Sequence, residues 1–145
     1  MIRRYDSGDR AALLAVWADS AAVAHPFWTA ARFEEERRDI DEQFLPVAET
    51  YVFERNGAVV GFISLLGNEV GGIFVAPQYH GQGIGTALMD WARDSRDVLE
   101  LDVFEANEIG RAFYAAYGFA VVEQRVDEAT GLPVLRLRLP REELS

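Results

Sequence analysis

Three glycines at alternate positions, Gly81, Gly83 and Gly85, stand between a strand-like run and a helix-like run of this chain. The β-branched apolar run 73–75 and a proline turn precede them, and residues 86–89 favour a helix. Glycines let the backbone approach an anion closely, and the free N–H groups of the following helix point at it with the positive end of the helix dipole behind them. The segment therefore predicts a phosphate site built from a strand, a loop and a helix start.

Two common kinds of phosphate loop do not fit this segment. A Walker loop is excluded because Gly85 is followed directly by Thr86, without the lysine that reaches the outer phosphates. A Rossmann loop follows the first strand of a βαβ unit and has an acidic ribose ligand about 20 residues further on. Glu100 and Asp102 stand near that distance, but the loop comes mid-chain after a β-meander, so the context is wrong.

Length and composition predict one domain that spans residues 1–145. A hydrophobic share of 50% is enough to form a sizeable core. No apolar run reaches the length of about 18 residues that a membrane span needs, and no charged-then-apolar leader occurs. We therefore expect a cytoplasmic protein that has no membrane partner.

Charge and residue usage exclude several classes of function. The chain has no cysteine, which removes disulfides, thiolate metal ligands and a cysteine nucleophile together. Its two histidines, His25 and His80, are far apart, so we expect no metal site. A net charge of −10 argues against nucleic acid as a partner, because phosphate neutralisation supplies most of such affinity. The same charge favours a cationic partner such as an amine.

Hydrophobic periodicity and turn residues predict the order of elements. Strands are expected over residues 2–5, 50–55, 58–66, 70–75, 98–104, 119–126 and 134–139, and helices over 9–25, 29–44, 85–95 and 108–117. Ser7 or Asp9 is expected to cap the first helix, and Asn56-Gly57 predicts a tight hairpin. The expected fold class is α/β (α+β), with a mixed, mostly antiparallel sheet of about seven strands and about four flanking helices.

Two sequence blocks, at a separation that makes a chance match improbable, resemble the GCN5-related N-acetyltransferase (GNAT) family. The first is His80-Gly81-Gln82-Gly83-Ile84-Gly85, and the second is Asn107-Glu-Ile-Gly-Arg-Ala-Phe-Tyr-Ala-Ala-Tyr-Gly-Phe119. With the element order β-α-α-β-β-β-α-β-α-β-β, the resemblance covers nearly the whole chain. His25-Pro-Phe27, Phe44-Leu-Pro46 and Gly131-Leu-Pro133 look most like the small bacterial members of the YjaB and YiaC type.

The first block departs from the family pattern at one position. The family has Arg or Gln, two variable residues, Gly, one variable residue, then Gly or Ala, and here His80 stands in the first place. A frame that begins at Gln78 also fits. We prefer the frame from His80, because Gly85 and the residues after it lead into the helix as they do in the family.

The resemblance implies acetyl-CoA as co-substrate, with the pantetheine arm lying along the fourth strand as a false extra strand. Gly71-Gly72 inside that strand fits the bulge that such a splay needs. The cofactor-binding residues expected from this placement are Ile73, Phe74, Val75, His80, Gly81, Gln82, Gly83, Ile84, Gly85, Thr86 and Asn107. Asn107 is also expected to act as the N-cap of the helix over 108–117.

The implied reaction is acetyl transfer to a primary amine, and without cysteine the simplest route is direct attack on the thioester. We expect Tyr114 to protonate the departing thiolate: with a phenol pKa near 10 and a thiol pKa near 8.5 this transfer is only slightly uphill, and the protein can tune either value. Helical spacing places Ile109, Phe113 and Tyr117 on a core stripe and Tyr114 on another face. The alternative is a packing tyrosine whose hydroxyl meets a backbone carbonyl.

The base and the acceptor site are less defined. Glu69 stands eleven residues before His80, which resembles the place of the catalytic glutamate in the histone-acetylating branch; the alternatives are a solvated turn residue or a water chain as base. His25, Phe27 and Trp28 are candidate acceptor contacts through cation–π interaction, or else core and helix-end residues. A small amine, a peptide N-terminus and a protein lysine stay open as acceptors. A non-catalytic acyl-CoA-binding regulatory module is the alternative function, and the protein is either a monomer or a homodimer.

Overall fold

The computed structural model describes residues 1–140 and has the predicted order of elements in that range. The strands are β1 (Ile2–Arg4), β2 (Glu49–Arg55), β3 (Ala58–Leu66), β4 (Glu69–Val75), β5 (Val98–Phe104), β6 (Ala120–Val126) and β7 (Pro133–Pro140). The α-helices are α1 (Arg10–Ala24), α2 (Ala30–Asp39), α3 (Ile84–Asp94) and α4 (Glu108–Tyr117), and α2 continues into a π-helical turn, Ile40–Phe44.

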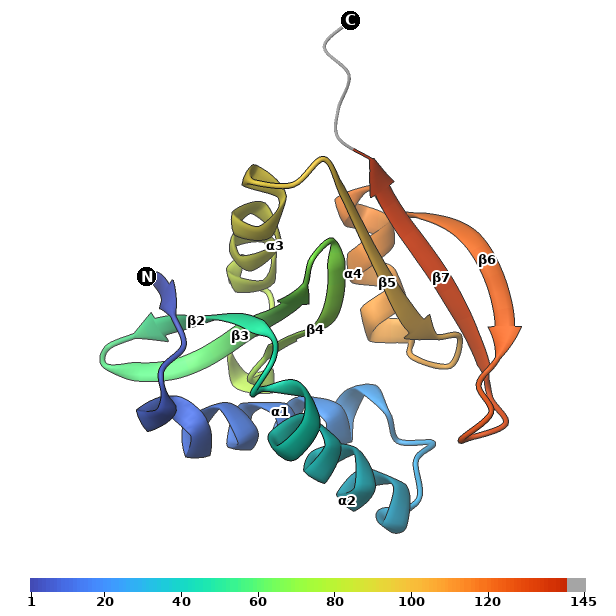
Figure 1. Cartoon of the computed structure of the whole chain (residues 1–145), viewed down its shortest axis with the longest axis horizontal. Helices are drawn as coiled ribbons and strands as arrows, with labels where there is room; N and C mark the ends of the chain where they lie inside the picture. The colour runs from blue at the N-terminus through green and yellow to red at the C-terminus, as the bar shows by residue number, and fades with distance from the viewer. Residues whose placement is uncertain (141–145) are drawn as a thin grey trace, which may run out of the picture.

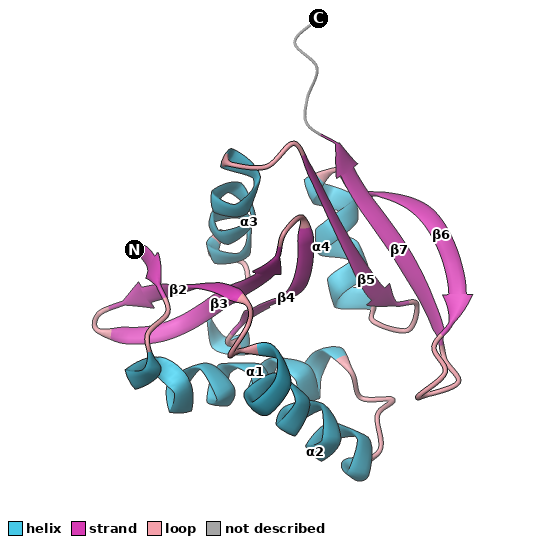
Figure 2. Cartoon of the chain, viewed as in Figure 1, coloured by secondary structure: helices cyan, strands magenta, loops and turns pink. Residues whose placement is uncertain are grey.

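One mixed sheet forms the middle layer, with strand order β1-β2-β3-β4-β5-β7-β6 (Figure 1). Neighbouring strands are antiparallel except β4 and β5, which are parallel. Helices α1 and α2 lie on one side of the sheet, and α3 and α4 lie on the other (Figure 2). The predicted fold class and element order are confirmed.

The larger core lies between the sheet and the α3–α4 layer. Ile84, Leu88 and Ala92 recur at helical spacing on α3 and are buried. They belong to one cluster with Leu99 and Leu101, which alternate along β5 and point to the same side of the sheet. Burying each such large apolar side chain contributes about 1.5–3 kcal/mol, so this cluster holds α3 against the sheet.

A second core lies under α1, where Leu13 and Trp17 pack against Val52 of β2 and Phe62 of β3. The helix is entered through a 3-10 turn, Ser7–Asp9. The cap of this turn is Asp6, whose carboxylate accepts from the Gly8 N–H at 2.8 Å, while Asp9 accepts from the Asp6 N–H at 3.0 Å. Asp9, one of the two predicted caps, is the N-cap residue of α1, but its side chain makes no cap hydrogen bond to that helix.

Strand β4 contains the predicted bulge. Ser64 of β3 pairs with Gly72 and the next residue, Leu65, pairs with Val70, so Gly71 is left without an opposite residue. A Cβ atom at Gly71 would lie 2.0 Å from Cζ of Phe44, so only glycine fits there without movement of that ring.

The bulge lies where β4 leaves its other neighbour. Strands β4 and β5 pair at Glu69 and Glu100, and beyond that point they diverge, so the sheet opens into a gap (Figure 1). The predicted splay of the fourth strand is confirmed. Within residues 1–140, no helix is long and apolar enough to cross a membrane.

Candidate active site

A cavity of about 950 Å³ lies at the gap between β4 and β5. Its walls come from β4, the glycine loop and the start of α3, the end of β5, the start of α4, and the α1–α2 region. The cavity therefore lies where strand divergence leaves backbone groups without a strand partner.

The edge of β4 offers polar backbone groups to this cavity. The Ala76 N–H donates to the Val60 carbonyl at 2.9 Å, and Phe74 stands opposite Phe62 two residues earlier. Hydrogen-bonding pairs alternate along an antiparallel ladder. Ile73 and Val75, the residues on either side of Phe74, therefore direct their backbone groups away from β3. These groups face the gap, as expected for the strand edge that pairs with pantetheine.

One of these groups already has partners. The Val75 carbonyl accepts from Ser20 Oγ of α1 at 2.8 Å, and His80 Nε2 lies 2.9 Å from the same oxygen. A carbonyl oxygen can only accept, so this geometry requires the proton on Nε2. The open groups of this edge are thus the N–H and C=O of Ile73 and the N–H of Val75, and His80 folds back onto the strand.

The glycine loop ends in an uncapped helix start. Gly81 and Gly83 have φ values of 78° and 82°, a left-handed conformation that glycine adopts without strain. Gly83 is the N-cap of α3 and has no side chain to satisfy the first turn. The N–H groups of Ile84, Gly85 and Thr86 consequently have no intrahelical acceptor, and they point out at the positive end of the helix dipole. A helix start of this kind is suited to bind an anion.

Gln82 differs from the rest of the loop. Its side-chain oxygen accepts a hydrogen bond from Arg55, which lies next to the turn of the β2–β3 hairpin. Gln82 does not line the cavity. The other predicted cofactor residues, on β4, in the loop, on α3 and at Asn107, all do.

Asn107 lies at the start of α4, across the cavity from the loop. Its Oδ1 accepts from the Gly110 N–H at 2.9 Å, which confirms the predicted N-cap. Asn107 is 7% exposed, and no residue in the described part of the chain bonds to its Nδ2. A donor is therefore available at the cavity wall.

Tyr114 lines the cavity about two turns further along α4 than Asn107. Its ring meets Phe113 and Phe119 edge-on at 5.5 and 5.7 Å, and burial raises its pKa above the ordinary value for tyrosine. Among residues 1–140, none hydrogen bonds to the hydroxyl. A protonated phenol with a free donor thus faces the cavity.

The predicted division of α4 into two faces is wrong. Tyr114 packs against the core together with Phe113 and Tyr117, whereas Ile109 is 48% exposed. The first turn of α4 lies over the gap, where no strand stands beneath it, and Ile109 therefore lines the cavity instead of the core.

Glu69 lies at the start of β4 and does not line the cavity. Its carboxylate oxygens lie 2.5 and 2.7 Å from the two terminal nitrogens of Arg136 on β7. It is a strand residue in an ion pair, and not the solvated turn residue considered as an alternative. Its role as a base stays a prediction.

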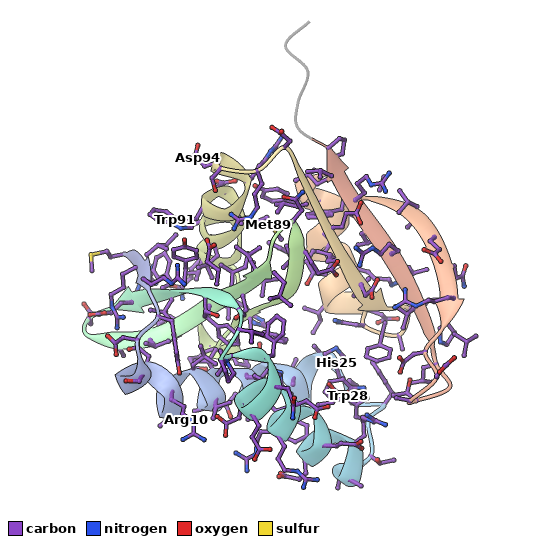
Figure 3. The ribbon with its side chains drawn as sticks, in the orientation of Figure 1. Arg10, His25, Trp28, Met89, Trp91 and Asp94 are labelled. Atoms are coloured by element: carbon purple, nitrogen blue, oxygen red, sulfur yellow. The ribbon has the colours of Figure 1, made fainter. Side chains whose placement is uncertain are left out.

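The predicted acceptor residues form an aromatic group with Phe104 of β5. His25 and Trp28 lie next to each other (Figure 3), with stacked rings whose centroids are 4.1 Å apart. Phe104 meets the two rings edge-on at 5.7 and 5.8 Å. Phe27 packs against Phe104 at 5.5 Å but does not line the cavity, whereas His25 and Trp28 do. Burial lowers the pKa of His25 to about 4, so its ring is neutral at neutral pH.

Ser20, Asp102 and Phe104 line the cavity and were not among the predicted site residues. Ser20 gave no signal, being one polar residue in an alanine-rich helix. Asp102 and Phe104 share a face of β5 by simple alternation, which could have revealed them. Burial acts to raise the pKa of Asp102, but hydrogen bonds from Arg125 and Arg136 outweigh it and hold the pKa below its usual range.

The fold and the site together define a class of protein. An open sheet edge beside an uncapped helix start, with a phenol that lines the same cavity, is the arrangement of an acyl-CoA-dependent acyltransferase. Comparison with known proteins agrees, since the model of the acetyltransferase (GNAT) domain matches residues 46–121. This chain belongs to the GNAT family and is an acetyl-CoA-dependent N-acetyltransferase.

Several relatives span the whole chain. Peptidyl-lysine N-acetyltransferase YiaC of Escherichia coli K12 is 31% identical, with 97% of each chain covered. Peptidyl-lysine N-acetyltransferase YjaB of the same organism is also 31% identical, over 94% of this chain and 91% of that protein. The solution structure of apo YjaB from E. coli superposes with a TM-score of 0.84 over 95% of each chain.

A more distant solved structure shows the same fold with a cofactor bound. PaiA N-acetyltransferase from Thermoplasma acidophilum, in complex with coenzyme A, has a TM-score of 0.76 at 19% identity, over 94% of this chain and 96% of that one. The resemblance to small bacterial GNAT proteins that the two sequence blocks indicated is confirmed.

Proposed function

We propose that this enzyme acetylates lysine side chains of peptides or proteins. YiaC and YjaB are both named peptidyl-lysine N-acetyltransferases. The observation that carries the proposal is one continuous cavity, which extends from the N–H groups at the start of α3, past the edge of β4, to His25 and Trp28. Such a cavity has room for the cofactor arm at one end and for a long acceptor side chain at the other. The proposed location is the cytoplasm, where acetyl-CoA is available.

On the cofactor side, the helix start would bind the pyrophosphate. The N–H groups of Ile84, Gly85 and Thr86 are free, and the helix dipole favours an anion there. The open backbone groups of Ile73 and Val75 would take the pantetheine amides, as they would take an added strand. His80, bonded to the Val75 carbonyl, holds the loop in place.

The reaction needs a proton donor for the leaving sulfur. The acceptor nitrogen bonds to the acetyl carbon, the carbon–sulfur bond breaks, and the thiolate takes up a proton. Tyr114 is the proposed donor, because it lines the cavity, its hydroxyl has no hydrogen-bond partner among the described residues, and burial keeps it protonated. The amine's own proton passes to water or to Glu69. The water route is favoured, since Arg136 occupies both oxygens of that carboxylate.

On the acceptor side, aromatic walls and carboxylates suit a lysine. His25, Trp28 and Phe104 offer flat surfaces to the methylene groups, and ring faces attract an ammonium group. Glu36 and Asp39 also line the cavity, and burial raises the pKa of Glu36. Carboxylates here would draw a protonated amine towards the site before it loses its proton.

The test is acetylation of an N-terminally blocked peptide that contains one lysine, followed by mass spectrometry and thiol release. All 14 basic residues of this chain are arginine, so the enzyme adds no lysine acetylation of its own to the signal. The matched control peptide has arginine in place of lysine. Acetyl-CoA binding with transfer only to a peptide α-amine or to free small amines would overturn the lysine assignment.

A further inference from the structure

The two parts of the sheet meet at a pair of like charges. Strands β4 and β5 pair at Glu69 and Glu100, and the Glu100 N–H donates to the Asn68 carbonyl at 2.9 Å. Both side chains are carboxylates, and the two residues stand side by side at this junction. Repulsion between them would push the strands apart at the point where the cofactor gap begins.

One guanidinium group lies between the two strands. Arg136 of β7 contacts Glu69 at 2.5 and 2.7 Å, Glu100 at 2.7 Å and Asp102 at 3.2 Å. Its side chain is 21% exposed, so water screens these contacts only in part. Arg136 thus joins a carboxylate of β4 to two carboxylates of β5.

The neighbouring arginines do not duplicate this contact. Arg138 pairs with Glu100 at 2.8 Å, and Arg125 pairs with Asp102 at 2.7 Å. In the described part of the chain, Arg136 is the one cation that pairs with Glu69. Loss of Arg136 would leave Glu100 and Asp102 with one cation each and Glu69 with none.

We propose that Arg136 is a positioning residue, which holds β4 and β5 at the separation that acetyl-CoA requires. The junction lies two residues before the bulge at Gly71 and four before Ile73, whose backbone faces the gap. A small change of strand separation at Glu69 is therefore carried directly to the groups that would bind pantetheine. Arg136 acts through the strands and does not itself reach the cofactor site. The inference rests on the proposed placement of the cofactor along β4.

The first experiment measures acetyl-CoA affinity of Arg136→Gln by calorimetry. The expected result is an acetyl-CoA affinity weaker by about tenfold, with a smaller change in kcat. The reason is that the variant leaves the partly buried carboxylate of Glu69 without its cation, which is costly. Arg138→Gln is the matched control, since it lies on the same strand and face but contacts only Glu100 among the carboxylates. The control is expected to bind acetyl-CoA within about twofold of wild type.

Charge rescue separates positioning from general stability. The double variant Arg136→Gln/Glu69→Gln removes the unpaired carboxylate, and it is expected to recover most of the lost affinity. Arg136→Lys keeps the charge but loses the planar fork, so it should fall between wild type and Arg136→Gln. Folded Arg136→Gln with wild-type affinity, or a double variant no better than the single one, overturns the proposal.

Hydrogen exchange tests the junction without any cofactor. The Glu100 amide, bonded to Asn68, should exchange faster in Arg136→Gln, while amides in β2 and β3 keep their rates. Unchanged exchange at Glu100 would contradict the inference even if affinity falls. If wild type failed to bind acetyl-CoA, the cofactor placement would fall, and the exchange result would still decide the role of Arg136 at the junction.

Discussion

His80 Nε2 and the carbonyl oxygen of Val75 lie 2.9 Å apart, and this hydrogen bond ties the glycine loop to the end of β4. His80 stands where the family has Arg or Gln, so a side chain that reaches back to the strand has replaced the usual residue. The bond joins the two parts of the proposed cofactor site, the edge of β4 and the start of α3.

Removal of this tie should weaken acetyl-CoA binding without slowing the chemistry. His80→Ala is expected to raise the KM for acetyl-CoA by about fivefold, because a neutral hydrogen bond contributes about 1 kcal/mol. The value of kcat should change by less than about twofold. His80→Gln, which restores a residue of the family pattern, is the control. A fall in kcat with unchanged KM would mean that His80 acts in the reaction itself.

Tyr114→Phe tests the proton donor. The expected loss in kcat is about 100-fold or more, with unchanged acetyl-CoA affinity. Stability should not fall, because the hydroxyl has no partner within residues 1–140. Tyr117→Phe is the matched control, since that hydroxyl donates to Asp90 at 2.5 Å and Tyr117 does not line the cavity between β4 and β5. Equal activity of the two variants would assign Tyr114 a packing role.

The buried His25 should make stability fall in mild acid. Its pKa is about 4 in the folded protein and about 6.5 in an unfolded chain, so the unfolded state binds more protons between these values. The contribution of His25 to the free energy of unfolding should therefore have its full value above about pH 6.5. Towards pH 4 the free energy of unfolding should fall by up to about 1.4 kcal/mol per pH unit because of this group. Urea titrations of wild type and His25→Gln at several pH values separate the contribution of His25 from that of the other groups. Parallel curves would contradict it.

The bulge at Gly71 should be intolerant of any side chain. Gly71→Ala places a Cβ atom 2.0 Å from the Phe44 ring, so we expect a loss of about 1–3 kcal/mol in the free energy of unfolding. Gly71→Ala/Phe44→Leu makes room and should recover much of that loss. Thermal or urea unfolding checks both variants. A double variant as unstable as Gly71→Ala would place the cause in the backbone of the bulge.

Phe104→Leu tests the aromatic wall of the acceptor site. The KM for a lysine peptide should rise by about threefold to tenfold, as expected for loss of a cation–π contact, while the KM for acetyl-CoA stays unchanged. Trp91→Phe, on the exposed side of α3, is the control for a change of aromatic surface elsewhere. An equal rise for both substrates would point to a general distortion of the cavity.

Features set by neighbouring residues were predictable from the sequence. The order of elements, the Gly81–Gly83–Gly85 loop, the bulge at Gly71-Gly72 and the Asn107 cap each depend on local backbone geometry and on side-chain periodicity. The predicted position of Asp9 at the N-cap of α1 is of the same local kind, although the 3-10 turn before the helix leaves the side-chain cap to Asp6.

The tertiary structure decided which distant residues meet. Glu69 resembled a catalytic base in sequence, but the strand order brings it to Arg136, 67 residues away, because β7 lies beside β5 and β5 beside β4. Likewise, the divergence of β4 and β5 leaves the backbone groups of Ile73 without a strand partner. The end of β5 places Phe104 against His25 of the α1–α2 region. Sequence alone thus determined the family and the local shape of the loop, whereas long-range strand pairing determined which charges and rings surround the cavity.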